Sequence, residues 1–393
     1  MTGRQWKIGG AVAALLLAFA VGQAMLERAA AQGARQQVPK FEVDPLWPKQ
    51  LPNNWIIGSA VGVAVDASDR IWLLHRPSTL LDNEKAAALD PPRAECCYPA
   101  PPVLVFDQAG NLIKSWGGRK PGVDEWPDSE HGLFIDYKGN VWLGGNGGKD
   151  AQVMKFTQDG KFLMKIGNKG QSGGSNDTAN FRQPTTVWVD PATNEAYVAD
   201  GYGNRRVAVF DADSGQYKRH WGAYGAKPDD ADPYNSGSAN VAANYDPNGP
   251  PAKQFGRAVH CAAVSKDGLV YVCDRTNNRI QVFRRDGTFV KEAFIDKKAR
   301  GFGSAFEVGF SIDPQQRFLF NLDGMNEHVV IMQRDSMQIL DTFGHKGRQP
   351  GQFYAVHSIA VDSKGNIYTA ETQEGKRLQR FLYRGLSAPA RGN

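Results

Sequence analysis

Short apolar segments with a period of two follow one another along most of this chain, and turn residues separate them. In the clearest stretch, Val264–Phe289, the turns Asp267-Gly268 and Asp286-Gly287 flank segments such as Val-Tyr-Val-Cys and Arg-Ile-Gln-Val-Phe. A period of two is typical of strands with one buried face, and Asp-Gly between two such segments favours a hairpin. Helical periodicity is nearly absent after the N-terminal segment, so the pattern predicts an all-β protein.

The same unit of strand, turn, strand, loop, strand, turn and strand recurs along the chain. Its copies begin near Val65, Ile135, Val189, Val264, Ile312 and Val361. Four-stranded units repeated radially form propeller blades. The signature Asp-x-x-Asn-x-Arg-hydrophobic-x-hydrophobic-Phe resembles the NHL family of repeats. We therefore expect a six-bladed β-propeller of NHL type. An open solenoid or a sandwich is the alternative, and terminal strands that share a blade would change the count by one.

The N-terminal segment differs from the rest of the chain. Arg4 and Lys7 precede an apolar run, and an Ala-x-Ala pattern ends before Gln32. This order is typical of a secretory signal peptide, although an uncleaved anchor is an alternative. We predict a signal peptide at residues 1–31, one propeller domain at 32–393, and a periplasmic or secreted protein.

Composition limits the partners. The 43 glycines and 22 prolines among 393 residues suit a chain with many tight turns. The net charge is +5, and removal of residues 1–31 takes away three basic residues and one acidic residue, which leaves +3. The basic residues are scattered, so we expect no nucleic-acid partner and no membrane contact beyond a possible anchor. The sequence leaves the oligomeric state open.

The four cysteines are compatible with an oxidising compartment. Cys261 and Cys273 lie on the two strands of one predicted hairpin and could form a cross-strand bond. Cys96 and Cys97 are adjacent in a proline-rich insertion. Sequence alone leaves the pairing open.

Three histidines occupy the same place in three of the six units. Each lies five residues before the polar residue that ends the first strand, at His131, His260 and His357. The other three units carry Val61, Thr185 and Val308 at the place that we take as equivalent. Histidines in alternate blades would converge on the propeller axis. Three neutral imidazoles with an open fourth position are a ligand set of catalytic zinc.

A second group of residues stands at the ends of the second strands. Tyr202 lies there between Gly201 and Gly203, and Arg275 and Arg76 hold the corresponding places in two other units. We expect these side chains at the same mouth of the channel as the histidines. Arginine binds carboxylates through its fork of donors, and a tyrosine beside a cation can act as a base.

Both groups stand in segments that resemble the peptidyl-α-hydroxyglycine α-amidating lyase family. The family's Pro-His-Gly-Leu-Ser-Ile-Asp, Pro-His-Ser-Leu-Ala and Pro-His-Asp-Ile are similar to Glu130-His-Gly-Leu-Phe-Ile-Asp, Val259-His-Cys-Ala-Ala and Val356-His-Ser-Ile-Ala. Its Val-Ser-Asp-Gly-Tyr-Cys-Asn-Ser-Arg and Ala-Asp-Arg-Glu-Asn-Gly-Arg-Ile-Gln are similar to the segments that begin at Val198 and Cys273. The resemblance covers Val61 to Phe381.

The resemblance implies a zinc-dependent lyase that cleaves a carbinolamide to an amide and glyoxylate. His131, His260 and His357 would hold zinc, Tyr202 and Arg275 would be catalytic, and Arg76 would bind the substrate carboxylate. The substrate would be a small molecule or a peptide. The long loops differ from the family, so the sequence leaves the physiological substrate open.

One departure from the family concerns its structural calcium. The family has aspartate directly after the last histidine, and this chain has Ser358. The main-chain carbonyls of Val61 and Leu133 could still bind calcium, but the loss of a carboxylate weakens a calcium site. Gly203 also replaces a cysteine, so one disulfide of the family is absent.

Two other functions remain alternatives. The protein could be a non-catalytic NHL propeller that acts as a periplasmic binding or scaffold protein, since a fold does not fix a function. It could also be a lactonase-like metal-dependent hydrolase. The metal site of that group is built from Glu, Asp and Asn, so three histidines argue against it.

Overall fold

The computed structural model describes residues 22–23, 37–119, 125–232 and 240–389. The chain divides into two compact units, one of residues 41–383 and one that joins residues 1–40 with 384–393. In the smaller unit the described residues are a helical pair at 22–23 and strand residues at 38–40 and 384–387.

The predicted signal peptide at residues 1–31 lies outside the described residues, apart from 22–23. Its cleavage and the proposed compartment therefore stay predictions. Among the residues that the structure describes, no helix is long and apolar enough to cross a bilayer.

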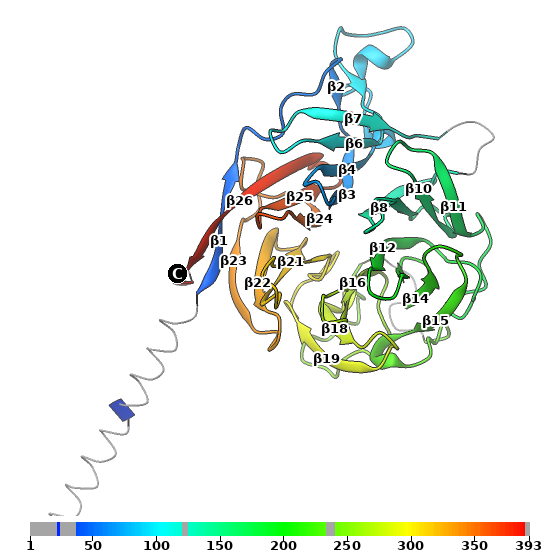
Figure 1. Ribbon diagram of the computed structural model, residues 1–393, viewed down its shortest axis with the longest axis vertical. Coiled ribbons are helices and arrows are strands. Elements are labelled where there is room, and N and C mark those ends of the chain that lie inside the picture. The colour runs from blue at the N-terminus through cyan, green and yellow to red at the C-terminus, as the bar shows by residue number, and fades with distance from the viewer. Residues whose placement is uncertain (1–21, 24–36, 120–124, 233–239, 390–393) are drawn as a thin grey trace, which may run out of the picture. The chain divides into compact units, whose positions relative to one another are not determined.

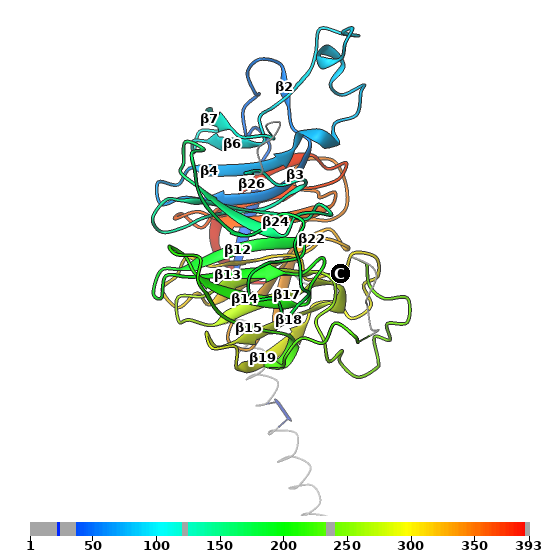
Figure 2. The same cartoon turned by 90° about the vertical axis from the view of Figure 1, so that its right-hand side faces the viewer.

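Six four-stranded sheets surround one axis as blades (Figure 1), and a short parallel sheet pairs β2 (Trp55–Ile56) with β5 (Tyr98–Pro99). The strands of the first and third blades run across the side view (Figure 2). The first three blades, from the inner strand outward, are β3 (Ser59–Val65), β4 (Ile71–Arg76), β6 (Val103–Phe106) and β7 (Leu112–Trp116); β8 (Glu130–Ile135), β9 (Val141–Gly145), β10 (Gln152–Phe156) and β11 (Phe162–Gly167); and β12 (Pro184–Asp190), β13 (Glu195–Asp200), β14 (Arg206–Asp211) and β15 (Tyr217–Trp221).

The remaining blades follow the same order, and the last one contains the N-terminal strand. They are β16 (Val259–Val264), β17 (Val270–Asp274), β18 (Arg279–Phe283) and β19 (Phe289–Phe294); β20 (Val308–Phe310), β21 (Phe318–Asp323), β22 (His328–Gln333) and β23 (Ile339–Phe343); and β24 (Val356–Val361), β25 (Ile367–Glu371), β26 (Arg377–Ser387) and β1 (Val38–Asp44). The prediction of a six-bladed propeller is confirmed, with the two terminal strands in one blade.

The repeat signature has a physical explanation in a buried cluster at the start of the third strand. In blade four the Asp274 carboxylate accepts hydrogen bonds from Arg279 Nε (2.7 Å), Asn277 Nδ2 (2.8 Å) and the Gly256 amide (2.8 Å). Asp200 is held in the same way by Arg206 and Asn204 in blade three. A buried carboxylate is tolerated only where charge and hydrogen bonds compensate it. The aspartate, asparagine and arginine are therefore a single structural unit.

The inner strands are irregular at the histidines. In each of the three histidine-bearing blades the register of the first hairpin shifts next to the histidine, between His131 and Leu133, between Val259 and Cys261 and between Val356 and Ser358. A β-bulge turns a side chain away from the direction that strict alternation would give it. The shift thus decides where the imidazoles lie.

The register that we expected for blade five is wrong. The residue equivalent to the histidines there is Phe306 and not Val308, since the Phe306 carbonyl accepts a hydrogen bond from His260 as the Thr185 carbonyl does from His131. The inner strand of this blade ends at Phe310, and the amide of the next residue, Ser311, bonds to the Phe318 carbonyl across the turn. The expected position at Val308 is therefore two residues too late in the chain.

Candidate active site

The three predicted histidines come together at the centre of the ring of blades. Their ligand atoms all lie within 4.8 Å of one another, and the ring centroids are 5.0 Å (His131–His260), 4.8 Å (His131–His357) and 4.7 Å (His260–His357) apart. Nitrogen ligands 2.0–2.1 Å from one zinc are about 3–4 Å apart, so the imidazoles need to approach only slightly to share an ion. No second cluster of three His, Cys, Asp or Glu ligands occurs in the described part of the chain.

Each imidazole faces the backbone of the next blade with its Nδ1 atom. His131 Nδ1 lies 3.2 Å from the Thr185 carbonyl oxygen, and His260 Nδ1 lies 2.7 Å from that of Phe306. His357 faces the Val61 backbone, although its Nδ1 does not reach hydrogen-bonding geometry. An Nδ1–H that donates to a carbonyl leaves the lone pair on Nε2, which is the tautomer that metal-binding histidines adopt.

His260 carries the clearest sign of a missing partner. The side chain is 1% exposed, and its buried Nε2 has no hydrogen-bond partner among the described residues. A buried ring nitrogen without a partner is costly and needs an explanation. A metal ion among the three histidines would supply that partner, so the residues present fit zinc.

The three imidazoles are neutral at physiological pH. Burial lowers the pKa of His131 and of His260 well below the ordinary value of 6.5, and the neighbouring imidazoles and arginines add to the effect. Burial, followed by the charges of Arg76 and Arg275, lowers the pKa of His357 to about 3. Neutral imidazole is the form that binds a metal ion.

Tyr202 and Arg275 form a hydrogen-bonded pair at the edge of the histidine cluster. Arg275 Nη1 donates to the Tyr202 hydroxyl oxygen (2.9 Å), and that hydroxyl lies 3.2 Å from His131 Nε2. The guanidinium also lies over the Tyr202 and Phe306 rings, at 5.2 and 4.9 Å from their centroids. A guanidinium that donates to a phenol oxygen stabilises negative charge on that oxygen.

The loop that carries Tyr202 is fixed by close packing. A Cβ atom on Gly201 would lie 2.1 Å from the Val259 carbonyl oxygen, and a Cβ atom on Gly203 would lie 2.2 Å from Arg182 Cγ. Neither glycine has a positive φ. Both are therefore needed for the close approach of neighbouring atoms and not for a left-handed backbone conformation.

Arg76 lies at the end of β4 and is oriented by the second blade. Its Nε donates to the Glu130 carbonyl (2.7 Å) and its Nη2 donates to Asn146 Oδ1 (2.7 Å), which also accepts from Ser129 Oγ (2.9 Å). These contacts hold the guanidinium in one direction before any substrate binds. Preorganisation of this kind lowers the cost of binding a carboxylate.

A cavity of about 140 Å³ joins most of these side chains. Arg76, His131, Tyr202, Arg275 and His357 line it, together with Phe302, Phe306, Gly324, Ala355, Thr372 and Gln373. All six predicted catalytic, carboxylate-binding and zinc-binding residues thus lie at one site. Their roles stay predictions.

Sequence reasoning missed two residues of this site. Phe306 packs against His260 (ring centroids 5.3 Å apart) and His357 (6.0 Å), and the error in the blade-five register hid it. Asn146 directly follows β9, at the same place in its blade as Arg275. The rule that identified Arg275 would therefore have found Asn146.

Ser358, the residue after the last histidine, does not support the predicted calcium site. Ser358 Oγ accepts a hydrogen bond from the Val63 amide (3.0 Å), and its hydroxyl bonds to the Glu307 carboxyl. The carboxyl group beside Ser358 thus comes from blade five, and a calcium site at the Val61 and Leu133 carbonyls stays a prediction.

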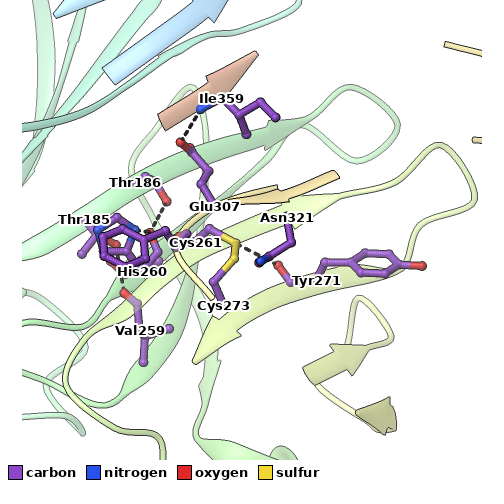
Figure 3. The surroundings of a disulfide bond; sticks show 12 residues. Thr185, Thr186, Val259, His260, Cys261, Tyr271, Cys273, Glu307, Asn321 and Ile359 are labelled. Carbon is purple, nitrogen blue, oxygen red and sulfur yellow. Dashed lines mark hydrogen bonds between the residues drawn. A yellow bond between two sulfur atoms is a disulfide. The ribbon is translucent and has the colours of Figure 1, made fainter. Parts of the chain in front are cut away.

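The four cysteines form two disulfides, Cys96–Cys97 and Cys261–Cys273. The second joins β16 to β17 directly after His260 (Figure 3), with a sulfur–sulfur distance of 2.01 Å. It therefore links the strand that carries His260 to the strand that precedes Arg275.

The comparisons with known proteins agree with the repeat and with the fold. Residues 259–283 match the model of the NHL repeat. The chain is 28% identical over 334 residues to peptidylglycine alpha-amidating monooxygenase of Rattus norvegicus, an alignment that covers 80% of this chain and 29% of the rat protein. It is 24% identical over 335 residues to the probable peptidyl-alpha-hydroxyglycine alpha-amidating lyase of Caenorhabditis elegans, with 82% of each chain covered.

The chain thus spans less than a third of the rat protein's length. Among solved structures, that of streptogramin B lyase matches with a TM-score of 0.51 and 12% identity, over 89% of this chain and 99% of the other. That match shows the fold alone. From repeat, relatives and architecture together, this chain is a six-bladed β-propeller with an NHL-repeat match at residues 259–283, and it resembles the peptidyl-α-hydroxyglycine α-amidating lyases.

Proposed function

We propose that this protein is a zinc-dependent lyase that cleaves an N-acyl-α-hydroxyglycine-like carbinolamide to an amide and glyoxylate. The observation that carries the proposal is the convergence of three neutral imidazoles, one with a buried and unpartnered Nε2, beside a tyrosine hydroxyl that accepts a hydrogen bond from arginine. The name of the Caenorhabditis elegans relative, a probable peptidyl-alpha-hydroxyglycine alpha-amidating lyase, supports this reaction class.

His131, His260 and His357 would hold the zinc, which supplies Lewis-acid polarisation of the substrate hydroxyl when it is bound. The chain's own groups then have separate tasks. Arg76 binds the substrate carboxylate, since Glu130 and Asn146 fix its direction toward the cavity. Arg275 stabilises the phenolate of Tyr202 through its 2.9 Å hydrogen bond.

Tyr202 as phenolate takes the proton of the substrate hydroxyl. The C–O bond becomes the carbonyl of glyoxylate while the C–N bond breaks, and the electrons of that bond go to the amide nitrogen. Tyr202 then returns the same proton to this nitrogen. Atoms and electrons balance without any redox partner, and one group acts first as base and then as acid.

The proposal is tested by incubation of the purified, zinc-loaded protein with N-benzoyl-α-hydroxyglycine and measurement of glyoxylate. We expect glyoxylate and benzamide in equal amounts, well above the spontaneous reaction, and loss of the excess after zinc is removed by a chelator. A protein with one zinc per chain that yields glyoxylate only at the spontaneous rate would refute the lyase and would favour a binding or scaffold propeller.

A further inference from the structure

A second and larger cavity, of about 500 Å³, lies farther along the same inner strands. The strands that present His131, His260 and His357 continue into it with Leu133, Ala263 and Ile359. No residue lines both this cavity and the one that contains Tyr202 and Arg275. The larger cavity is therefore separate from the proposed active site and has no task in the lyase reaction.

The wall of this cavity is mostly apolar and partly aromatic. The Trp188 ring lies 4.8 Å from that of Phe134 and 6.2 Å from that of Phe310, measured between centroids. Aliphatic side chains of all the inner strands complete the wall, among them Val63, Leu133, Val187, Ala262, Ile359 and Val361. An apolar wall of this size with few polar groups is typical of a small-molecule site.

Two carboxyl groups line this wall. The Asp362 carboxylate accepts hydrogen bonds from Asn366 Nδ2 (2.8 Å) and the Tyr368 hydroxyl (3.1 Å) at the adjoining turn. The second is that of Glu307. Its Oε2 accepts a hydrogen bond from the Ile359 amide (3.1 Å, Figure 3), and the Ser358 hydroxyl bonds to the same carboxyl. No ion pair to Glu307 occurs in the part of the chain that the structure describes. Burial raises its pKa to about 7. Lys266 also lines the cavity, but no ion pair joins it to Glu307 among the described residues, and a carboxyl group buried without a paired cation is costly.

A ligand that matches this wall combines an apolar body with one cationic donor. The body would lie against Trp188 and Phe310, and the donor would reach Glu307. An anionic ligand would meet the carboxyl group with like charge, and a wholly apolar ligand would leave it without a partner. We propose that the channel cavity binds an amphipathic amine whose ammonium group donates to Glu307. This proposal does not depend on the lyase activity.

Three fluorescent probes of equal size test the proposal on the full-length protein. Each carries a dansyl group on a five-carbon chain, which ends in an amine, a carboxylic acid or a methyl group. Dansyl emission rises on entry into an apolar site, so titration gives the affinity of each probe. We expect saturable binding, with the amine probe about tenfold tighter than the methyl probe, as a hydrogen bond to a charged group provides, and the acid probe weakest.

Variants of the protein test whether Glu307 causes the preference for the amine probe. Glu307→Gln keeps an acceptor for the Ile359 amide and should bring the amine and methyl probes within about twofold, as expected once a charge-assisted bond is lost. Glu307→Asp keeps the charge and should retain a preference for the amine. Lys266→Gln is the matched control, because it removes a charge from the wall of the same cavity, and it should leave the preference intact.

Three results would overturn the proposal. The first is no preference for the amine in the unaltered protein. The second is a preference that persists in folded Glu307→Gln protein, which would place the ammonium elsewhere. The third is displacement of the amine probe by millimolar calcium in the unaltered protein and not in Glu307→Gln, which would assign Glu307 to a cation site.

Discussion

His260 is the most constrained side chain of the histidine cluster. Its Nδ1 is fixed by the Phe306 carbonyl at 2.7 Å, and its Nε2 is buried without a partner among the described residues. Replacement of His260 by alanine should lower the zinc content of the purified protein well below one per chain, because one of three protein ligands is lost. His345→Ala, at an exposed histidine, is the control and should leave the zinc content unchanged. Equal zinc contents in both variants would place the metal elsewhere.

In the proposed reaction Asn146 would act on the substrate through Arg76. Its side-chain oxygen accepts from Arg76 Nη2 at 2.7 Å and from Ser129 Oγ at 2.9 Å. Asn146→Ala should raise KM by about tenfold or more, which corresponds to the loss of one hydrogen bond to a charged group, with kcat changed less. Steady-state kinetics measures KM and kcat separately and so checks this prediction. The exposed control Asn111→Ala should leave KM unchanged. An unchanged KM in Asn146→Ala as well would contradict the binding of the substrate carboxylate by Arg76.

At the scale of one element, the loop between β13 and β14 shows how tight packing serves the site. Gly201→Ala would bring a Cβ atom to 2.1 Å from the Val259 carbonyl oxygen, a backbone atom in the strand that carries His260. Overpacking of this kind costs about 1–3 kcal/mol of unfolding free energy. Urea unfolding should show that loss for Gly201→Ala and almost none for Gly148→Ala, where no atom lies within 4 Å. Equal stabilities would show that the loop can shift.

The hairpins of the blades were predictable because each carries its own turn chemistry. Asp136, for example, accepts hydrogen bonds from the Lys138 and Asn140 amides and from Trp142 Nε1 (2.9 Å), so the residues that close the turn also fix the strand after it. Local signals of this kind can be read from sequence. Blade five has Ser311 at this place and Asp313 two residues later. The aspartate resembles the residue that closes the turn in other blades, which moved the expected register by two residues and hid Phe306.

The site could be predicted only in part. Equivalent positions in a cyclic repeat placed the histidines and Tyr202 near one axis, since the ring of blades brings like positions together. The direction of the Arg76 guanidinium and the surroundings of the Glu307 carboxyl group depend on contacts between blades. Asn146 and Ser358 make these contacts, and no pattern within a single repeat encodes them.

At the scale of the whole molecule, zinc would link three blades. Its ligands come from β8, β16 and β24, so unfolding of the propeller must release it. A ligand at 100 times its Kd adds about 2.7 kcal/mol to the unfolding free energy. That gain corresponds to a rise in Tm on the order of 5 °C for a protein of this size. Calorimetry with and without a chelator should show the difference in the unaltered protein and its absence in His260→Ala. The same Tm in both conditions would mean that no metal bridges the blades.

Tyr202 is the group that moves the proton in the proposed reaction. Its hydroxyl lies 3.2 Å from His131 Nε2 and 2.9 Å from Arg275 Nη1. The most direct measurement is the rate of glyoxylate release by Tyr202→Phe and by the unaltered protein, compared at equal zinc content. Removal of a positioned base predicts a kcat lower by about 10²–10⁴-fold, with zinc and fold retained. A phenylalanine variant as active as the unaltered protein would contradict the account.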